Sequence, residues 1–330
     1  MNIAFTLCSN NYLAHAKTLG DSFLKYHPDF KFIIGLVDRY EKNFDYSFFS
    51  ALEIILVEEL GIKEFDELIN KYNITELNTS VKPSYFHFLF KKYKANKILY
   101  LDPDILVTSR FEEVFEALNN KNIILTPHLI TPVDDGFWPS DHHTLAGGVF
   151  NLGFIGLSDY ESVKYFLDWW HQRVVKYGFL DYCRAMFYDQ LWINYVPIFY
   201  ENYCILKHLG YNMANWNLHE RKLTINDEGD FIVNNMFLLR FFHFSSYDYK
   251  KPDIICKYQD RFDFNSRPDL TTLFDRYNQQ LVENNVAAIS KLDVYYYPNI
   301  NNPILKNEPI IKKIAYRFKN AIKILIKGKL

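Results

Sequence analysis

The sequence predicts an α/β fold with a mainly parallel central sheet flanked by helices. Two observations lead to this prediction. Short, continuous apolar runs alternate with amphipathic segments through the first half of the chain. In addition, 330 residues provide enough material for a large core. Strands that are buried on both faces appear as continuous apolar runs, and such strands belong to parallel sheets covered by helices.

The first half contains strands and helices in alternation. The strands are expected at 2–8, 31–38, 53–59, 97–102 and 122–127. The helices are expected over 12–27, around 63–72, over 73–93 and, shorter, near 111–120. The stretch 128–146 is polar, contains proline and is long for a connection, and loops of this length are usually functional or mobile.

The second half begins with a strand over 147–157 that glycines interrupt, and glycine inside a strand often marks the close approach of a ligand. An aromatic-rich helix is expected over 159–177. Residues 222–247 predict a hairpin that turns at Glu228-Gly229, followed by a buried strand that ends at His243. A further helix is expected over 268–285. We therefore predict one α/β domain over 1–265, a packed helix and linker over 266–304, and a separate tail over 305–330.

Composition narrows the classes of function. The formal net charge is −2, so nothing points to a nucleic-acid partner. The four cysteines are scattered without metal-like spacing, which indicates free thiols in a reducing compartment. The N-terminal MNIAFTLCSN lacks the features of a signal peptide, and no uninterrupted apolar segment is long enough to span a bilayer. A cytoplasmic protein is expected.

The stretch KILYLDPDILV (97–107) places Asp102 and Asp104 directly after an apolar strand. Burying two unpaired carboxylates side by side is costly, so something must compensate their charge. Strand ends of this kind face the ligand-binding edge of open α/β sheets, and Pro103 makes the turn rigid. Two fixed oxygen ligands suit a divalent cation, which in turn holds an anion such as a diphosphate.

Two alternatives to a metal site exist for this motif. A solvated turn whose aspartates cap the next helix is the common role of an arbitrary D-x-D, but the apolar residues on both sides disfavour a surface turn. A phosphatase with an aspartate nucleophile requires Thr or Val at the position that Leu106 occupies. The metal site is therefore the favoured interpretation.

LYLDPDILV resembles the metal-binding motif of GT-A glycosyltransferases, and the chain is most similar to glycosyltransferase family 8. The resemblance covers about residues 1–252 and includes further motifs in the family's order. These are FNLGFIGL (150–157), YDQLWIN (188–194) and HFSSYDYKKP (243–252). The resemblance implies the GT-A nucleotide-diphospho-sugar transferase fold.

The resemblance also implies roles for individual residues. The metal, Mn²⁺ or Mg²⁺, would be bound by Asp102, Asp104 and His243, and an imidazole ligand favours manganese. Uracil and ribose would contact Thr6, Asn10 and Tyr12; the donor sugar would contact Asn151 and Gly153; Asp189 and Gln190 would face the reacting carbon. Two alternatives remain: His243 as a satisfied core residue, and Asp189 as a helix N-cap.

The sequence departs from the family pattern at two places. In the end motif, Ser246 replaces a glycine and the KKP triplet arrives two residues late, which affects the expected diphosphate contact from Lys250. The family's arginine in the helix before the D-x-D corresponds to His87. Lys82 is the substitute candidate for a phosphate-binding cation.

Two polar segments are open to two interpretations each. The long loop carries several acids and histidines, namely Asp134, Asp135, Asp141, His142 and His143. It is either a solvated mobile loop or a lid over the bound donor. In NMANWNLHERK (212–222), Trp216 either stacks on a sugar or anchors a surface loop, and its neighbours His219, Glu220 and Arg221 are candidates for acceptor contacts.

The tail 305–330 has a different composition from the rest of the chain. Apolar residues recur at steps of three and four, and lysines occupy most of the remaining positions. A basic amphipathic helix of this kind binds an anionic membrane surface or packs on protein. We favour peripheral contact with the inner face of the membrane.

Together these observations predict a metal-dependent, hexosyltransferase-like enzyme. It would transfer a sugar from a nucleoside-diphosphate sugar, UDP-linked by preference, to a hydroxyl of a glycan or glycolipid in bacterial-type surface polysaccharide synthesis. One alternative is a sugar nucleotidyltransferase, although CSNNYLAH after the first strand lacks the expected glycines. The other is a catalytically silent glycan-binding or scaffold protein of the same fold.

Overall fold

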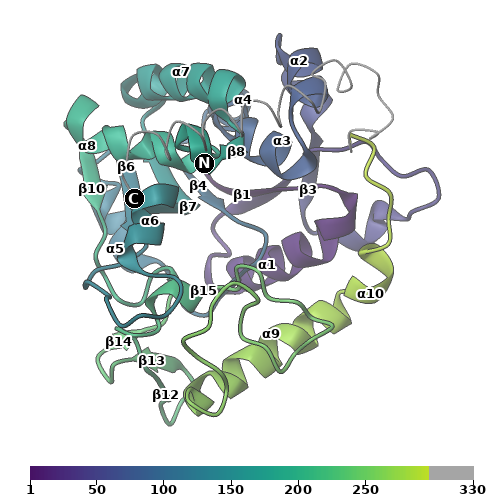
Figure 1. The fold of residues 1–330 in the computed structure, drawn as a ribbon. Coiled ribbons are helices and arrows are strands. Elements are labelled where there is room, and N and C mark those ends of the chain that lie inside the picture. Colours follow the sequence, from purple (N-terminus) through teal and green to yellow (C-terminus); the bar gives the residue numbers. More distant parts are fainter. Residues whose placement is uncertain (297–330) are drawn as a thin grey trace, which may run out of the picture.

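The computed structural model describes residues 1–296 and is built around a seven-stranded sheet in the order β10-β6-β7-β4-β1-β2-β3 (Figure 1). These strands are β1 (Asn2–Cys8), β2 (Lys31–Leu36), β3 (Glu53–Leu56), β4 (Lys97–Leu101), β6 (Ile123–Pro127), β7 (Phe150–Ser158) and β10 (Tyr203–Ile205). Neighbouring strands run parallel, except that β7 is antiparallel to both β4 and β6. The predicted mainly parallel α/β sheet is confirmed.

Helices cover both faces of this sheet (Figure 1). One face packs on α1 (Leu13–Tyr26), and the other on α3 (Ile74–Ser80), α4 (Lys82–Tyr93) and α7 (Tyr160–Tyr177), with α2 (Phe65–Lys71) beside them. Alternate residues of β1 enter the two cores: Ala4 packs in the α1 layer, whereas Ile3 and Phe5 pack in the α4 and α7 layer. The continuous apolar run of β1 reflects this burial on both sides.

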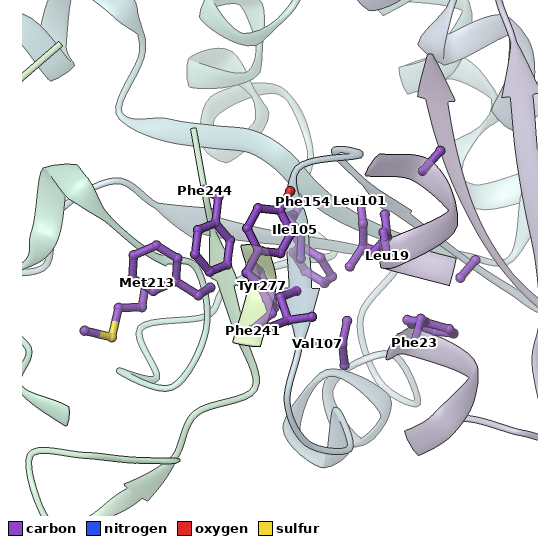
Figure 2. Packing of buried hydrophobic residues seen from close by; sticks show 14 of the residues in the cluster. Leu19, Phe23, Leu101, Ile105, Val107, Phe154, Met213, Phe241, Phe244 and Tyr277 are labelled. Carbon is purple, nitrogen blue, oxygen red and sulfur yellow. The ribbon is translucent and has the colours of Figure 1, made fainter. Parts of the chain in front are cut away.

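A smaller three-stranded sheet adjoins the α1 layer and supports the functional edge. It consists of β11 (Met213–Ala214), β15 (Phe241–His243) and β5 (Ile105–Val107). Figure 2 shows the core that it shares with α1 and with α9 (Thr271–Glu283). The Phe244 ring stacks on Tyr277 of α9, with ring centroids 3.8 Å apart. This packing anchors the residue that follows His243.

Several boundaries differ from the expectation. The single helix expected over 73–93 is wrong, because α3 ends at Ser80 and α4 begins at Lys82. Pro83 explains the break, since proline is tolerated in the first turn of a helix but not in its interior. The strand expected over 53–59 ends at Leu56 and continues as a 3₁₀ turn. The long loop contains a short helix, α6 (Asp141–Gly147).

The remaining elements mostly follow the expected pattern. The hairpin pairs β12 (Leu223–Ile225) with β13 (Phe231–Val233), and Gly229 has φ +83° in its turn. The shorter elements are α5 (Glu112–Ala117), β8 (Leu180–Asp181), β9 (Met186–Phe187), α8 (Val196–Phe199), β14 (Phe237–Leu238) and α10 (Val286–Ile289). The four cysteines are free.

The expected amphipathic helix over 305–330 lies outside the described residues. Within residues 1–296, none of the helices combines the length and the apolar character that crossing a membrane requires. The division of the chain at 265 and 304 stays a prediction.

Candidate active site

The expected metal ligands meet where β4 and β15 end. The backbone N–H of Asp102 donates to the carbonyl of Gly153 in β7, at 2.8 Å, and so fixes the start of the acidic turn. The carbonyl of Asp104 accepts the N–H of Phe244, also at 2.8 Å. Since β15 pairs antiparallel with β5, His243 lies opposite Ile105, next to the aspartates. Residues far apart in sequence are thus held at one point by backbone hydrogen bonds.

The three side chains have the spacing of a metal site. The Nε2 of His243 lies 3.1 Å from Asp104 Oδ1 and 3.7 Å from Asp102 Oδ2. One potential ligand atom from each residue lies within 4.8 Å of the others. Two carboxylate oxygens and one imidazole nitrogen fit a divalent cation of the manganese type. The residues present therefore fit the implied metal.

The electrostatics of this cluster indicate unbalanced negative charge. Burial acts to raise the pKa of Asp104, but the nearby His243 outweighs it and holds this pKa below its ordinary value. Burial likewise acts to lower the pKa of His243, and the two carboxylates raise it above its ordinary value instead. The carboxylates thus attract positive charge onto the imidazole, as they would attract a cation between the three groups.

Gly153 makes room for His243. A Cβ atom at position 153 would lie 2.4 Å from Cε1 and 2.7 Å from Nδ1 of the His243 ring. Any larger residue would displace the imidazole from the carboxylates. The first glycine of FNLGFIGL therefore has a steric role toward the expected metal ligand His243, in addition to its predicted contact with the donor sugar.

A buried ion pair lies beside the acidic turn. Lys82 Nζ is 2.8 Å from Asp189 Oδ2, and both side chains are almost completely buried. Lys82 also donates to the carbonyl of Leu152 at 3.1 Å and lies over the ring of Tyr100, which donates its hydroxyl to Asp102 at 2.6 Å. Burial raises the pKa of Asp189, and Lys82 opposes that effect. The side chain of Asp189 makes no N-cap hydrogen bond, so the capping alternative is not observed.

Gln190 has both ends of its amide bound to backbone. Its Nε2 donates to the carbonyl of Gly147 at 2.7 Å, and its Oε1 accepts the N–H of Leu152 at 3.1 Å. These bonds connect the start of the 3₁₀ segment Gln190–Tyr195 to strand β7. Gln190 thereby keeps Asp189 next to Lys82.

The residues expected to bind the nucleoside lie at and after the carboxyl end of β1. Thr6 is fully buried, and its hydroxyl has no hydrogen-bond partner among residues 1–296. The Asn10 amide bonds the Arg39 carbonyl and the Tyr46 hydroxyl, both at 2.7 Å. Tyr12 stacks on the ring of His15, with centroids 4.1 Å apart.

Tyr12 is also influenced by the expected metal ligands Asp102 and Asp104. Its pKa is raised, first by burial of the hydroxyl and then by the negative charges of Asp104 and Asp102. The phenol is thus within electrostatic range of both carboxylates. The contact of Tyr12 with the nucleoside stays a prediction.

Lys250, expected to contact the diphosphate, shows no contact with the acidic turn among the described residues. Its ammonium lies 5.5 Å from the ring centroid of Tyr249, and the side chain is exposed. Ser246, in the family's glycine position, adopts φ +61°, a left-handed conformation that glycine adopts without strain. The backbone at this position therefore has a conformation that would favour the glycine of the family motif.

Sequence reasoning missed three side chains near the site. Tyr100 precedes Asp102 by two residues and so shares its face of the strand, which was an available signal. His128 follows the carboxyl end of β6, and its Nε2 lies 3.2 Å from Asn151 Nδ2. Asp38 follows β2 and accepts the N–H groups of Asn10 and Tyr295. All three lie within two residues of the carboxyl end of a strand.

The two polar segments are tied into the fold. Asp135 of the long loop pairs with Arg261 at 2.7 Å. Glu220 accepts the N–H groups of Ile130 and Thr131. Trp216 is only 7 % exposed and lies edge-on to His243, with ring centroids 5.2 Å apart. Arg221 is also buried, at 1 % exposure, and donates to the Tyr211 carbonyl.

The family model described as glycosyl transferase family 8 matches residues 2–156, just under half of the 330 residues. The chain is also 23% identical over 248 residues to the uncharacterized protein YfnD of Bacillus subtilis (strain 168), covering 73% of this chain and 76% of the relative. It is 23% identical over 159 residues to YfnF of the same organism, covering 47% and 50%. The expected similarity to family 8 is confirmed.

Solved structures with a similar arrangement are glycosyltransferases. The galactosyltransferase LgtC, in complex with donor and acceptor sugar analogs, matches 86% of this chain and 96% of its own, at 16% identity and a TM-score of 0.49. GlyE of Streptococcus pneumoniae TIGR4 matches 88% and 65%, at 16% identity and 0.48. Mouse xyloside xylosyltransferase 1 matches 74% and 97%, at 13% identity and 0.45.

Proposed function

Because the chain is a glycosyltransferase most similar to family 8, we propose that it transfers a sugar from a nucleoside-diphosphate sugar, with UDP as the nucleotide, to a hydroxyl of a glycan or glycolipid. One observation carries the proposal. Asp102 and Asp104 converge with His243 at a strand end, and this cluster has one more negative charge than even a protonated His243 can balance. A cation that in turn binds a diphosphate supplies the missing charge.

We assign Asp102, Asp104 and His243 as ligands of Mn²⁺, with Mg²⁺ as the alternative. When bound, the metal supplies Lewis-acid stabilisation of the charge that develops on the departing diphosphate. Glycosyl transfer breaks the bond between the anomeric carbon and this diphosphate, and the sugar gains oxocarbenium character. Stabilisation of the diphosphate therefore promotes cleavage of the bond.

The buried ion pair acts on the sugar side of the same bond. Lys82 compensates the charge of Asp189, so that an ionised carboxylate persists in a nearly water-free position. A fixed carboxylate at the reacting carbon stabilises positive charge there better than water does, because it needs no reorganisation. Gln190 holds this carboxylate in place, and Asn151 and Gly153 on β7 complete the sugar site.

The nucleoside end of the proposed site lies beside β1. Thr6, Asn10 and Tyr12 form the nucleoside end beside β1, and Lys250 provides a cation for the diphosphate. With a glycan or glycolipid as the acceptor, the enzyme would act in surface polysaccharide synthesis. The basic tail 305–330 would hold the enzyme at the inner face of a membrane where such acceptors are made.

Donor hydrolysis tests the proposal. The full chain is incubated with UDP-, GDP- and dTDP-sugars with and without Mn²⁺, and the released nucleotide is measured. We expect Mn²⁺-dependent release from a UDP-sugar. D104N should lower this rate at least about 100-fold, because it removes several kcal/mol of charge stabilisation. D227N, which changes an exposed aspartate in the hairpin turn, is the matched control and should be fully active.

Two results would contradict the proposal. Full activity of D104N without metal would exclude the metal-dependent mechanism. Absence of nucleotide release and of a thermal shift with every donor would favour the silent glycan-binding protein.

A further inference from the structure

The side chain of Asn151, at the start of β7, connects two histidines. Its Oδ1 lies 3.2 Å from Nδ1 of His243 and accepts the N–H of Gly153, also at 3.2 Å. Its Nδ2 lies 3.2 Å from Nε2 of His128. Asn151 is only 7 % exposed, so water does not compete strongly for these bonds.

The Gly153 N–H determines the orientation of the Asn151 amide. A backbone N–H can only donate, so the amide atom that faces it must be the oxygen. The opposite orientation would place the NH₂ group against the N–H and would leave two buried donors unsatisfied. The amide NH₂ therefore faces His128.

This orientation determines the protonation of both imidazoles. Since Oδ1 of Asn151 only accepts, Nδ1 of His243 must carry a proton and donate it. The other nitrogen, Nε2, faces Asp102 and Asp104, and it would offer its lone pair to a cation that replaces the proton it shares with Asp104. Since Nδ2 of Asn151 donates, Nε2 of His128 must accept, which keeps His128 neutral. Burial, which lowers the pKa of His128 to about 4, agrees with this state.

We propose that Asn151 is a positioning residue that holds His243 in the tautomer and orientation needed to ligate a divalent cation through Nε2. His128 supports Asn151 by accepting its amide hydrogen. This inference rests on the proposed function in one respect, namely that Asp102, Asp104 and His243 bind the metal. It gives Asn151 a role before any sugar is bound, in addition to the predicted sugar contact.

The packing around His243 strengthens the argument. The imidazole lies against Gly153, where no Cβ would fit, and Trp216 lies perpendicular to it. With the ring confined in this way, the proton on Nδ1 depends on whether position 151 offers an acceptor. Outer hydrogen-bond partners of this kind typically change metal affinity 10- to 100-fold.

The test measures Mn²⁺ binding to the full chain by titration calorimetry without any nucleotide sugar. N151A removes the acceptor and should weaken Mn²⁺ binding about 10- to 100-fold. N151D keeps an acceptor for both N–H groups and should bind at least as tightly as the wild type. N284A is the matched control: Asn284 is similarly buried at 8 % exposure and bonds Thr18 on α1, so its loss should leave the affinity unchanged.

The outcomes separate this inference from the proposed function. If N151A binds Mn²⁺ as tightly as the wild type while D104N does not bind, the positioning role is wrong and the metal assignment stands. If the wild type itself binds no Mn²⁺, both are wrong. Should N151A fail to fold, the near-isosteric N151L, which also accepts no hydrogen bond, gives the same comparison.

Discussion

Two charged clusters lie side by side in this protein and solve the problem of buried charge differently. The buried ion pair, Lys82 with Asp189, is closed: its side chains are 2 % and 4 % exposed and its charges cancel. The acid corner, Asp102 and Asp104 with His243, is open: the aspartate side chains are 29 % and 19 % exposed, and their charges exceed what one imidazole can neutralise. The open cluster, with its unbalanced negative charge, is therefore the one that we expect to bind a cation.

The difference has an energetic cause. An ion pair removed from water remains stable only if each charge has a partner, and breaking such a pair leaves one charge uncompensated. The acid corner avoids this cost by staying partly hydrated and by attracting a cation. The closed ion pair therefore gives one side of the site permanent charges at fixed positions. The open acid corner gives the other side a place where a cation can bind and leave.

The largest effect is expected from opening the closed pair. K82M leaves Asp189 buried without a counter-charge and should destabilise the fold by about 3–5 kcal/mol, measured by urea denaturation at neutral pH. The double variant K82M/D189L should recover much of this loss, since both charges are then absent. A double variant as unstable as K82M would show that the pair does not act as a charge-balanced unit.

His27, a buried titratable residue outside both clusters, provides a reference for an ionisable group that is buried without a counter-charge. His27 binds the Phe23 carbonyl and accepts the Phe111 N–H, and burial lowers its pKa from 6.5 to about 4. The unfolded chain therefore takes up this proton at higher pH than the folded protein does. The contribution of His27 to the free energy of unfolding should be fully present above about pH 6.5 and should be lost as the pH falls toward 4. The loss should reach up to about 3 kcal/mol.

Denaturation of the wild type and of H27N at pH 7 and pH 4.5 measures this contribution. H27N should have a lower free energy of unfolding than the wild type at both pH values, because it disturbs two hydrogen bonds. Between pH 7 and pH 4.5, however, H27N should lose less free energy of unfolding than the wild type does. An equal loss in the two proteins would mean that His27 is not held neutral by burial.

The smallest effect is expected at the acid corner without metal. D104N removes one of two neighbouring negative charges, so the free energy of unfolding in metal-free buffer should change by no more than about 1 kcal/mol. With Mn²⁺ at 100 times its dissociation constant, the wild type should gain about 2.7 kcal/mol and the variant nothing. A large loss in metal-free buffer would make the corner a closed structural cluster like the ion pair.

Local sequence was sufficient for the two aspartates of the acid corner, whereas His243 was assigned to it only through the resemblance to family 8. The apolar strand before Asp102, the rigid Pro103 and the late aspartate Asp104 are contiguous, and parallel topology places such a strand end at the binding edge. The hairpin before His243 and the glycine at position 153 were equally visible as local patterns. The helix break before Lys82 was less visible, because Pro83 is compatible with either a helix start or a kink.

Which side chains contact one another within the site could not be predicted in the same way. Lys82 was a candidate for phosphate contact, and its proximity to Asp189 depends on how α4 packs against β7 and the 3₁₀ segment at Gln190. The bond from Asn151 to His243 likewise requires that β15 and β7 meet at the turn after β4. No spacing along the chain encodes these contacts.

The sequence by itself determined the alternation of strands and helices, the acidic strand end and the apolar faces that form the two cores. These features depend on neighbouring residues, whose periodicity and backbone preferences act locally. Only the tertiary structure decided which charge pairs with which, because burial and distance between remote segments set the strength of each interaction. The open acid corner and the closed ion pair both combine carboxylates with a basic side chain, and they differ in how completely these charges are balanced and buried.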